Sequence, residues 1–398
     1  MSESQVKPVS KDVVILGGGM VGAATAIGLA QLGLNIAVIE AFEPEPYNDK
    51  QEIDIRVSAV SVASENLLER LGALAGLSQM RRAAYLGLET WELEGFITQF
   101  HADQVGVTHL GHIVENRLIQ LSLWEKFKQY DNIELLSPVR VERFSRHDDA
   151  VVVHLNNATC IEAKLLVGAD GANSQVRQWA GIGLTGWDYA QSAMLINIKT
   201  AQEQQDVTWQ QFTPNGPRSL LPLPGNHASL VWYDDANRIA QLSLMSEKAL
   251  GEQIKRHFPA RLDRDFEVLQ KGSFKLTRRH AQTYYSDNVV ILGDAAHTIN
   301  PLAGQGVNIG FKDVEAIISS VSSSLSKGEA WWEEGTLKAY EKLRYQDNQL
   351  MMTAMDLFYA GFSNELLPLK VMRNAALKIA NIDSPIKKHV LMYAMGLK

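Results

Sequence analysis

From residue 13 onward the chain contains apolar runs, and their hydrophobic periodicity changes along the sequence. Residues 13–16 (VVIL) and 35–39 (NIAVI) indicate short strands, and residues 21–32, which follow a glycine cluster, have the length of a helix. The 27 residues from 13 to 39 contain no charged side chain, which by length alone would suit a membrane span. The glycines and the change of period predict instead a buried β-α-β unit, because central strands of a parallel sheet are apolar on both faces.

The remainder of the chain divides into regions of contrasting pattern. Residues 61–71 and 118–130 predict helices, and short apolar runs between 133 and 168 predict strands. In residues 186–276, clusters of β-forming residues alternate with breaks rich in Pro and Gly. Residues 288–293 return to the pattern of a buried parallel strand, and helices follow. We predict an α/β domain, α+β overall, with an inserted and mostly antiparallel sheet and a helical C-terminus.

Composition narrows the class of protein. The 398 residues are 46% hydrophobic and 21% charged, as in globular chains. The formal net charge of −7 argues against nucleic-acid binding, which requires a basic surface. Cys160 is the only cysteine, and no set of His, Cys, Asp and Glu has metal-ligand spacing, so we expect no metal. The first residues lack the apolar core of a secretory signal, which predicts a cytoplasmic protein.

The glycine cluster has the spacing of a nucleotide-binding turn. Gly17, Gly19 and Gly22 form G-x-G-x-x-G between a predicted strand and helix, and Glu40 follows the next strand. Glycines let the chain turn sharply and let a pyrophosphate approach the helix N-terminus, where amide donors and the helix dipole favour anions. A carboxylate at the position of Glu40 suits ribose hydroxyls. The motif predicts a dinucleotide site and does not separate FAD from NAD.

A second motif, Gly293-Asp294, begins 276 residues after Gly17 and follows an apolar run. Asp294 is expected at the carboxyl end of a parallel strand, where it would accept hydrogen bonds from a ribityl chain or, alternatively, cap a helix. The glycines after Pro301 let the backbone lie against a flat ring. The helix that begins near Gly306 would direct its positive end at a reduced, anionic flavin. The whole string therefore favours a flavin.

A third string, D-G-x-x-S-x-x-R, spans residues 170–177 after a further predicted strand. By physical chemistry alone it is a capped turn into a helix, and Asp170 is either the cap or a ligand.

Together the three motifs resemble the class A flavoprotein monooxygenases of the p-hydroxybenzoate hydroxylase fold, over essentially the whole chain. Strings at residues 18–22, 56–59, 111–116 and 296–308 further resemble the ubiquinone-biosynthesis hydroxylases. The resemblance implies a discontinuous FAD-binding Rossmann domain, an inserted substrate domain and a C-terminal helical segment. The implied bounds are 1–75, 108–185 and 277–350 for the first domain, 76–107 and 186–276 for the second, and 351–398 for the segment.

The resemblance also implies which residues contact FAD. The glycine turn would cradle the pyrophosphate, Glu40 would hold the adenosine ribose, and Asp294 would hold the ribityl region. Asp170 would serve a motif shared by FAD and NAD(P)H. Two arginines stand where family members place arginines near FAD, with a surface ion pair as the alternative for each; they are Arg56 and Arg117. The expected contacts near the isoalloxazine are Pro301, Gly304, Gln305, Gly306, Val307 and Asn308.

The activity implied is hydroxylation of the aromatic ring of a polyprenylated quinol or phenol in ubiquinone biosynthesis, with O₂ as the oxidant. NAD(P)H or another reductant would reduce FAD, and oxygen transfer would proceed through a flavin C4a-hydroperoxide. Strings at residues 89–92, 231–234 and 355–364 resemble the members that install the last ring hydroxyl, which implies a demethoxyubiquinol substrate. No catalytic base stands out, because His109, His112 and His297 are candidates only by proximity to the motifs.

Other functions remain open at this point. A sister hydroxylase would act at another ring position, and a flavin-dependent isoprenoid reductase would reduce a double bond without consuming O₂. An NAD-dependent dehydrogenase would share the first motif, although the Asp294 string argues against it. A non-catalytic assembly subunit would have kept the flavin scaffold alone.

The C-terminal residues 365–398 differ in charge from the rest of the chain. They hold six Lys and Arg against two Asp and Glu, a local net charge of +4. A helical wheel places Leu369, Met372, Ala376, Ile379 and Ile382 on one side, opposite Lys370, Arg373 and Lys378. Such an amphipathic helix either packs on the core or contacts lipid or a protein partner of ubiquinone biosynthesis. A peripheral position at the inner membrane would bring the enzyme to its apolar substrate, and a homo-oligomer is left open.

Overall fold

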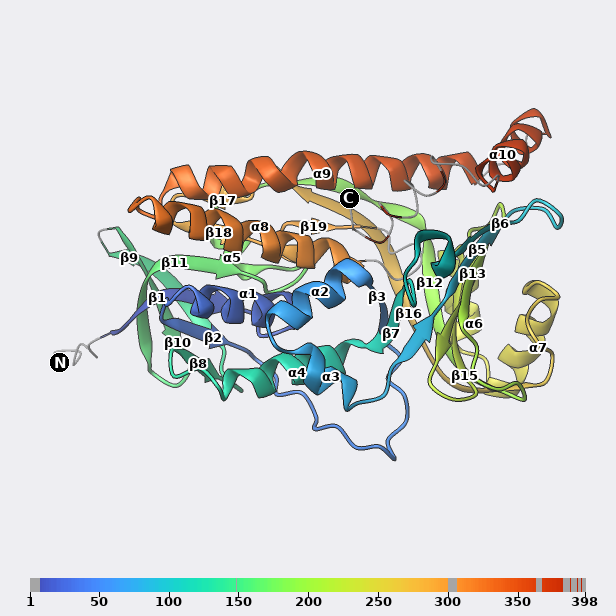
Figure 1. The fold of residues 1–398 in the computed structure, drawn as a ribbon, viewed down its shortest axis with the longest axis horizontal. Coiled ribbons are helices and arrows are strands. Elements are labelled where there is room, and N and C mark those ends of the chain that lie inside the picture. The colour runs from blue at the N-terminus through green and yellow to red at the C-terminus, as the bar shows by residue number, and fades with distance from the viewer. Residues whose placement is uncertain are drawn as a thin grey trace.

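The computed structural model describes residues 8–147, 149–299, 306–362 and 367–381, together with residues 387, 392 and 395. Its first sheet is parallel from β18 to β8, with β17 antiparallel at one edge, and β10 and β9 continue antiparallel from β11 (Figure 1). In spatial order the strands are β17 (Tyr285–Ser286), β18 (Val289–Ile291), β11 (Cys160–Gly168), β1 (Val9–Leu16), β2 (Ile36–Ile39) and β8 (Ile133–Leu136), with β10 (Ala150–Leu155) and β9 (Val141–His147) beside β11.

The predicted β-α-β unit is confirmed at the centre of this sheet. β1 and β2 pair in parallel, and helix α1 (Met20–Gln31) crosses between them with most of its residues buried. Val14 and Ile15 are fully shielded from solvent, which explains the absence of charge. α1 contacts two further helices, α4 (Asn116–Phe127) and α8 (Gly306–Ser326). Within the described residues, no helix is long and apolar enough to cross a bilayer.

The inserted region forms a second sheet, antiparallel except where β13 pairs with β5. Helices α6 (Ala236–Ser243) and α7 (Glu247–His257) cover one face, over a core that includes Met194 and Trp232. In spatial order its strands are β19 (His297–Thr298), β16 (Phe266–Ala281), β12 (Leu184–Thr200), β15 (His227–Asp235), β14 (Arg218–Leu223), β13 (Val207–Gln211), β5 (Gly87–Trp91) and β6 (Thr98–His101).

A small three-stranded sheet joins the two large ones. It consists of β3 (Val57–Ser61), β7 (Gly111–Glu115) and β4 (Ala83–Tyr85), and an apolar cluster packs it against the open face of the second sheet. Strand β4 lies in a segment expected in the substrate domain, yet it pairs with β7. The short helices nearby are α2 (Val62–Arg70), α3 (Leu74–Ser78) and α5 (Gln175–Trp179), with 3₁₀ turns η1 (Ala102–Val105) and η2 (Gly293–Ala295).

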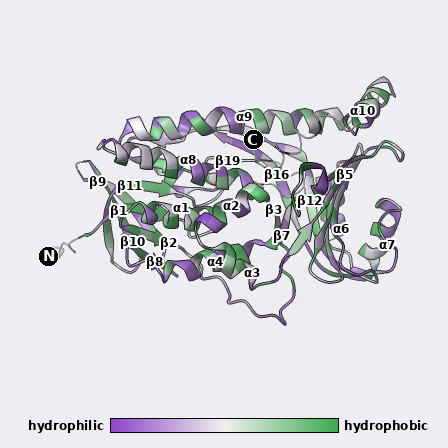
Figure 2. Ribbon diagram, viewed as in Figure 1, coloured by the Kyte–Doolittle hydropathy of each residue, from purple (hydrophilic) through white to green (hydrophobic). Residues whose placement is uncertain are grey.

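From Gly306 onward the described chain is mainly helical, as predicted. α9 (Glu334–Phe362) runs unbroken past residue 350, so the expected boundary of the C-terminal segment falls inside a helix. Hydrophobic and hydrophilic residues alternate along it (Figure 2). α10 (Leu367–Ala380) contacts α9 and β6.

The packing of α10 differs from a simple apolar-face arrangement. Arg373 on the predicted basic side forms an ion pair of 2.6 Å with Glu92, and Asn374 donates a hydrogen bond of 2.7 Å to the same carboxylate. Met372, from the predicted apolar side, is exposed, as is Val371. The helix therefore docks through polar side chains because Glu92 lies buried beside β5 and needs partners. Ile382 lies outside the described residues, as do Pro301, Gly304 and Gln305.

Candidate cofactor site

Four adjacent parallel strands carry the predicted motif residues at their carboxyl ends. β18 leads to Asp294, β11 to Asp170, β1 to Gly17, and β2 to Glu40. Carboxyl ends of parallel strands share one edge of a sheet, where open α/β sheets bind their ligands. β1 and β18, which are far apart in sequence, thus lie in one sheet with their carboxyl ends at the same edge (Figure 1).

The glycine turn is shaped by close backbone contacts. A Cβ on Gly17 would lie 2.3 Å from the carbonyl oxygen of Ala169, and one on Gly22 would lie 1.9 Å from that of Gly17. Gly17 also has a φ of +102°, which side chains disfavour. At Gly19, in contrast, no described atom comes within 4 Å of the Cβ position. Because Gly19 precedes the first turn of α1, this open space suits a phosphate group at the helix N-terminus.

Glu40 closes the turn from the neighbouring strand. Its two carboxylate oxygens accept hydrogen bonds from the amides of Gly18, at 2.8 Å, and Phe42, at 3.0 Å. Two side chains that the sequence analysis missed, Gln120 and Trp124 of α4, donate to the carbonyl of Gly18 at 3.0 and 2.7 Å. The turn is therefore preorganised by protein contacts, with a carboxylate where a ribose is expected.

Asp294 and Arg56 form the charged part of the site. Among the described residues, neither side chain has a hydrogen bond or ion pair, and both are exposed. Although the Asp294 side chain reaches solvent, the protein around it raises its pKa by desolvation, and the nearby charges of His297 and Arg56 act in the opposite direction. An acceptor and a guanidinium without protein partners fit the hydroxyls and phosphates of a nucleotide cofactor.

Asp170 makes contacts of the capping kind that was the alternative for it, although Ser174 is the N-cap residue of α5. Its carboxylate accepts hydrogen bonds from Ser174 Oγ, at 2.5 Å, and from the amide of Gln175, at 2.6 Å, at the start of α5. Arg177, in the same string, is buried and donates to the carbonyls of Ala295, at 2.8 Å, and Ala172, at 2.9 Å. This arginine joins the third motif to the second, a role that the sequence analysis did not assign.

The start of α8 is fixed by Asn308. Its amide group donates to the carbonyl of Ala59, at 2.8 Å, and its Oδ1 accepts from Ser61 N and Ser64 Oγ. The Asn308 side chain is thereby committed to protein contacts, and Val307 is buried. At Gly306 no described atom lies within 4 Å of the Cβ position.

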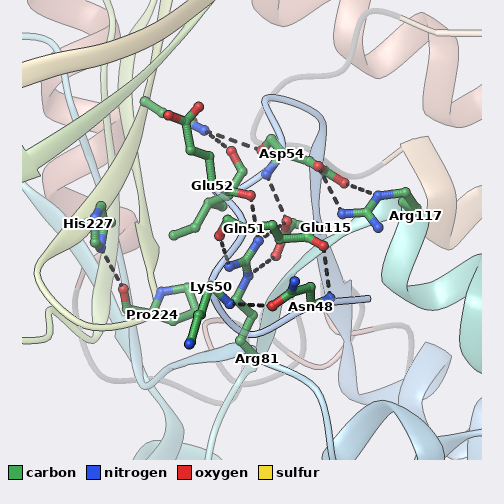
Figure 3. Close-up of polar contacts among 12 residues, drawn as sticks. Asn48, Lys50, Gln51, Glu52, Asp54, Arg81, Glu115, Arg117, Pro224 and His227 are labelled. Carbon is green, nitrogen blue, oxygen red and sulfur yellow. Dashed lines mark hydrogen bonds and ion pairs between the residues drawn. The ribbon is translucent and has the colours of Figure 1, made fainter. Parts of the chain in front are cut away.

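Arg117 has the ion pair that was the alternative for it (Figure 3). Its guanidinium binds both carboxylate oxygens of Asp54, at 2.8 and 3.1 Å, and the carbonyl of Glu45. Nearby, Arg81 forms an ion pair of 2.7 Å with Glu115 and donates hydrogen bonds to the carbonyls of Gln51 and Glu52. These contacts hold the loop between β2 and β3, which reaches the second sheet through Glu52 and Gln270.

Behind the second motif lies a buried charge network that the sequence analysis missed. Asp313 of α8 accepts hydrogen bonds from the amide of Gly293, at 2.9 Å, from His297, at 2.5 Å, and from Arg344, at 2.8 Å. Burial would raise the pKa of Asp313, but His297 and Arg344 lower it to about 2. Buried charges carry no periodic signal in a sequence, so only the fold pairs these residues.

Each of the three histidines named as a candidate base contacts a carboxylate of the protein. His297 is buried against Asp313, whereas His109 and His112 both bind Glu65 of α2. No described contact assigns any of them to a reacting ring.

Comparisons with known proteins identify the family of this chain. The chain matches the family described as FAD binding domain over residues 10–354. It is 48% identical to 3-demethoxyubiquinol 3-hydroxylase of Escherichia coli (strain K12), over 97% of this chain and 98% of that protein. It is 31% identical to ubiquinone hydroxylase UbiL of Rhodospirillum rubrum, over 97% and 89%.

A solved structure extends the likeness to the fold. The p-nitrophenol 4-monooxygenase PnpA from Pseudomonas putida DLL-E4 superposes with a TM-score of 0.79 at 18% identity, over 98% of this chain and 97% of that one. The predicted fold class and the FAD cofactor are confirmed by these matches, and the open positions at Gly19, Arg56 and Asp294 fit that cofactor. The family match covers most of the chain, and the chain therefore belongs to the FAD-binding flavoprotein monooxygenases.

Proposed function

We propose that this enzyme hydroxylates the aromatic ring of a polyprenylated quinol, a demethoxyubiquinol, in ubiquinone biosynthesis. The observation that carries the proposal is the 48% identity, over nearly the full length of both chains, to a protein named 3-demethoxyubiquinol 3-hydroxylase. The motif residues stand where this chemistry needs them, at the carboxyl ends of one set of parallel strands.

In this proposal each part of the site has a distinct task. Gly17, Gly19 and Gly22 admit the pyrophosphate of FAD to the N-terminus of α1, Glu40 holds its ribose, and Asp294 with Arg56 holds its central part. Bound FAD supplies the redox chemistry by which O₂ is activated. The N-terminus of α8, at Gly306, would present its positive helix end to the flavin ring.

The substrate ring is proposed to lie beside the apolar cluster between the small sheet and the second sheet. This cluster includes Ala193, Val231 and Tyr233, with Tyr85 and Tyr189 partly buried at its margin. An apolar wall excludes water, which protects a reactive oxidant from decay, and it suits a prenylated ring. NAD(P)H is the proposed electron donor, with another reductant as the alternative.

Labelled oxygen tests the proposed reaction. Purified holoenzyme, a demethoxyquinol with a short prenyl chain, NADH or NADPH and ¹⁸O₂ should yield a product with one ring hydroxyl that carries ¹⁸O. A reduced prenyl double bond without label would instead identify an isoprenoid reductase, and reductant oxidation that quinol fails to stimulate would contradict the hydroxylase.

The position of the new hydroxyl separates this enzyme from its sister hydroxylases. The relative UbiL is named a ubiquinone hydroxylase, and this chain is 31% identical to it. The same assay with quinols that lack different ring substituents gives the ring position by mass spectrometry. We expect turnover only with the demethoxy ring, and preference for an earlier intermediate would assign the alternative.

We further propose that α10 contacts the membrane. Val371 and Met372 are 61% and 67% exposed, although the other side of the helix is fixed to Glu92 by Arg373 and Asn374. Exposed apolar side chains on a basic segment suit a lipid surface with anionic headgroups. Docking to other ubiquinone-biosynthesis proteins and homo-oligomer formation stay predictions.

Replacing Val371 and Met372 together by Ser tests the membrane contact. We expect about tenfold weaker binding to vesicles that contain anionic lipid, because two apolar side chains no longer enter the interface. Co-sedimentation measures the binding, and turnover of a short-chain quinol should be unchanged. Leu244→Ser removes another exposed apolar side chain, at the end of α6, and serves as the control. Equal vesicle binding by all three proteins would contradict the contact.

A further inference from the structure

Two histidines and a glutamate that are distant in sequence meet beside α2. His109 Nε2 lies 2.7 Å from Glu65 Oε2, and His112 Nδ1 lies 2.5 Å from Glu65 Oε1. The imidazole rings meet edge to face, with centroids 4.6 Å apart. One donor atom from each of the three residues lies within 4.8 Å of the other two. The cofactor site described above makes no use of these three residues, which we name the Glu65 cluster.

The fold positions each member of the Glu65 cluster rigidly. Glu65 belongs to the first turn of α2, whose N-cap Ser61 accepts from the amide of Ser64. His112 is a residue of β7, between β3 and β4. Thr108 Oγ1 lies 2.8 Å from His109 Nδ1, which leaves Nε2 directed at Glu65. Such an outer contact fixes ring orientation, as for histidines that bind metals.

Burial and charge in the Glu65 cluster favour a cation. The side chains of Glu65 and His112 are 9% and 11% exposed, so the carboxylate is largely withdrawn from water. With both imidazoles neutral the cluster carries a charge of −1. A buried carboxylate requires a positive partner, and within the described residues it bonds only to these two imidazoles. His109, at 25% exposure, opens the cluster to solvent and gives an ion a route in.

The donor set selects the kind of cation. Two imidazole nitrogens and a carboxylate oxygen are ligands of Zn²⁺ and its transition-metal neighbours, whereas Mg²⁺ and Ca²⁺ prefer oxygen alone. Zinc bonds of about 2.0–2.2 Å to N and O require donor atoms roughly 3 Å apart, which the cluster reaches with small side-chain shifts. A fourth position, on the side of His109, would be taken by water.

We propose that Glu65, His109 and His112 form a binding site for one divalent transition-metal ion, with Zn²⁺ the natural occupant. The ion replaces the protons shared between carboxylate and imidazoles and joins α2 to β7. Ser64, next to Glu65, donates to Asn308 at the start of α8, so the ion also stabilises the segment that supports the cofactor site. This proposal is independent of the substrate assigned above.

Zinc binding to the FAD-loaded protein tests the site. After treatment with a chelator and its removal, Zn²⁺ is titrated against a chromophoric chelator, and X-ray absorption at the zinc edge counts the nitrogen and oxygen ligands. We expect one ion per chain, bound more than about tenfold more weakly by Glu65→Gln and by His109→Ala. Zinc should raise the Tm of the unaltered protein and leave that of both variants unchanged, because binding to the folded state alone stabilises it.

His101→Ala provides the matched control. His101 also pairs with a carboxylate, Asp103, at 2.8 Å, but both are exposed and no third ligand is adjacent among the described residues. Its zinc affinity should equal that of the unaltered protein. If Glu65→Gln fails to fold, the zinc affinity of His109→Ala tests the site, because His109 is the most exposed of the three ligands. Equal zinc affinity in His109→Ala and the unaltered protein, or displacement of zinc by millimolar Mg²⁺, would overturn the proposal.

Discussion

The Gly19→Val protein is expected to fold and to purify without FAD. Gly19 has a φ of −68°, which valine tolerates, and no described atom lies within 4 Å of its Cβ position. The new side chain would therefore occupy the space in front of α1 and would displace a pyrophosphate from the helix N-terminus. The loss of about two charge-assisted hydrogen bonds corresponds to roughly 3 kcal/mol, or about 100-fold in affinity. Flavin absorbance per protein and FAD titration of the apoprotein measure it.

Gly335→Val is the control for this substitution. Gly335 lies in the first turn of α9 and also has open space at its Cβ position. Its FAD content should match that of the unaltered protein, and far-UV circular dichroism should show that both variants are folded. Full FAD occupancy in Gly19→Val would place the pyrophosphate elsewhere and would remove the first motif from the site.

The Asp313→Ala protein is expected to lose about 3–5 kcal/mol of stability, because it leaves the buried guanidinium of Arg344 without its main partner. The amide of Gly293 loses its acceptor as well, so FAD affinity should also fall. Urea unfolding of the holoprotein and the apoprotein separates these effects. Asp347→Asn is the control, since Asp347 pairs with the same arginine at 2.5 Å but is 33% exposed, and should cost less than about 1 kcal/mol.

The contribution of Asp313 also has a predictable pH dependence. Its pKa in the folded protein is about 2, below the ordinary value of 3.8, so the unfolded chain binds the proton more readily. The stabilisation is therefore complete above about pH 4 and is lost as the pH falls toward 2. In Asp313→Asn this loss should be absent, and its stability deficit should narrow below pH 4. A deficit that is constant down to pH 2 would contradict the assignment.

Local sequence was sufficient to predict the main helices and strands and the FAD cofactor. The apolar run around Val14, the glycine turn and Glu40 each have a short-range cause, namely burial on both faces, backbone approach and the end of a strand. The match over residues 10–354 and the parallel sheet agree with those predictions. Local sequence left Asp170 and Arg117 open between cap or ion pair and ligand, because both uses place the same residue type at the same point of the chain.

The C-terminal helix shows where the local pattern leaves the packing undecided. The wheel separates an apolar side with Met372 from a basic side with Arg373, and a packed helix would bury the former. The structure instead exposes Met372 and fixes Arg373 to Glu92. Glu92 is 281 residues away from Arg373, so the periodicity of α10 does not indicate that Arg373 pairs with a buried carboxylate.

The sequence by itself determined the strand–glycine–helix unit, the order of the three motifs and the flavin family, since these depend on neighbouring residues. Only the tertiary structure decided which charges are paired. It joined Asp313 to Arg344 behind the second motif, Asn308 to the start of α2, and His109 and His112 to Glu65. The physical reason is that the desolvation of a charge depends on all elements packed around it. Turn geometry and strand burial, in contrast, are determined by a few consecutive residues.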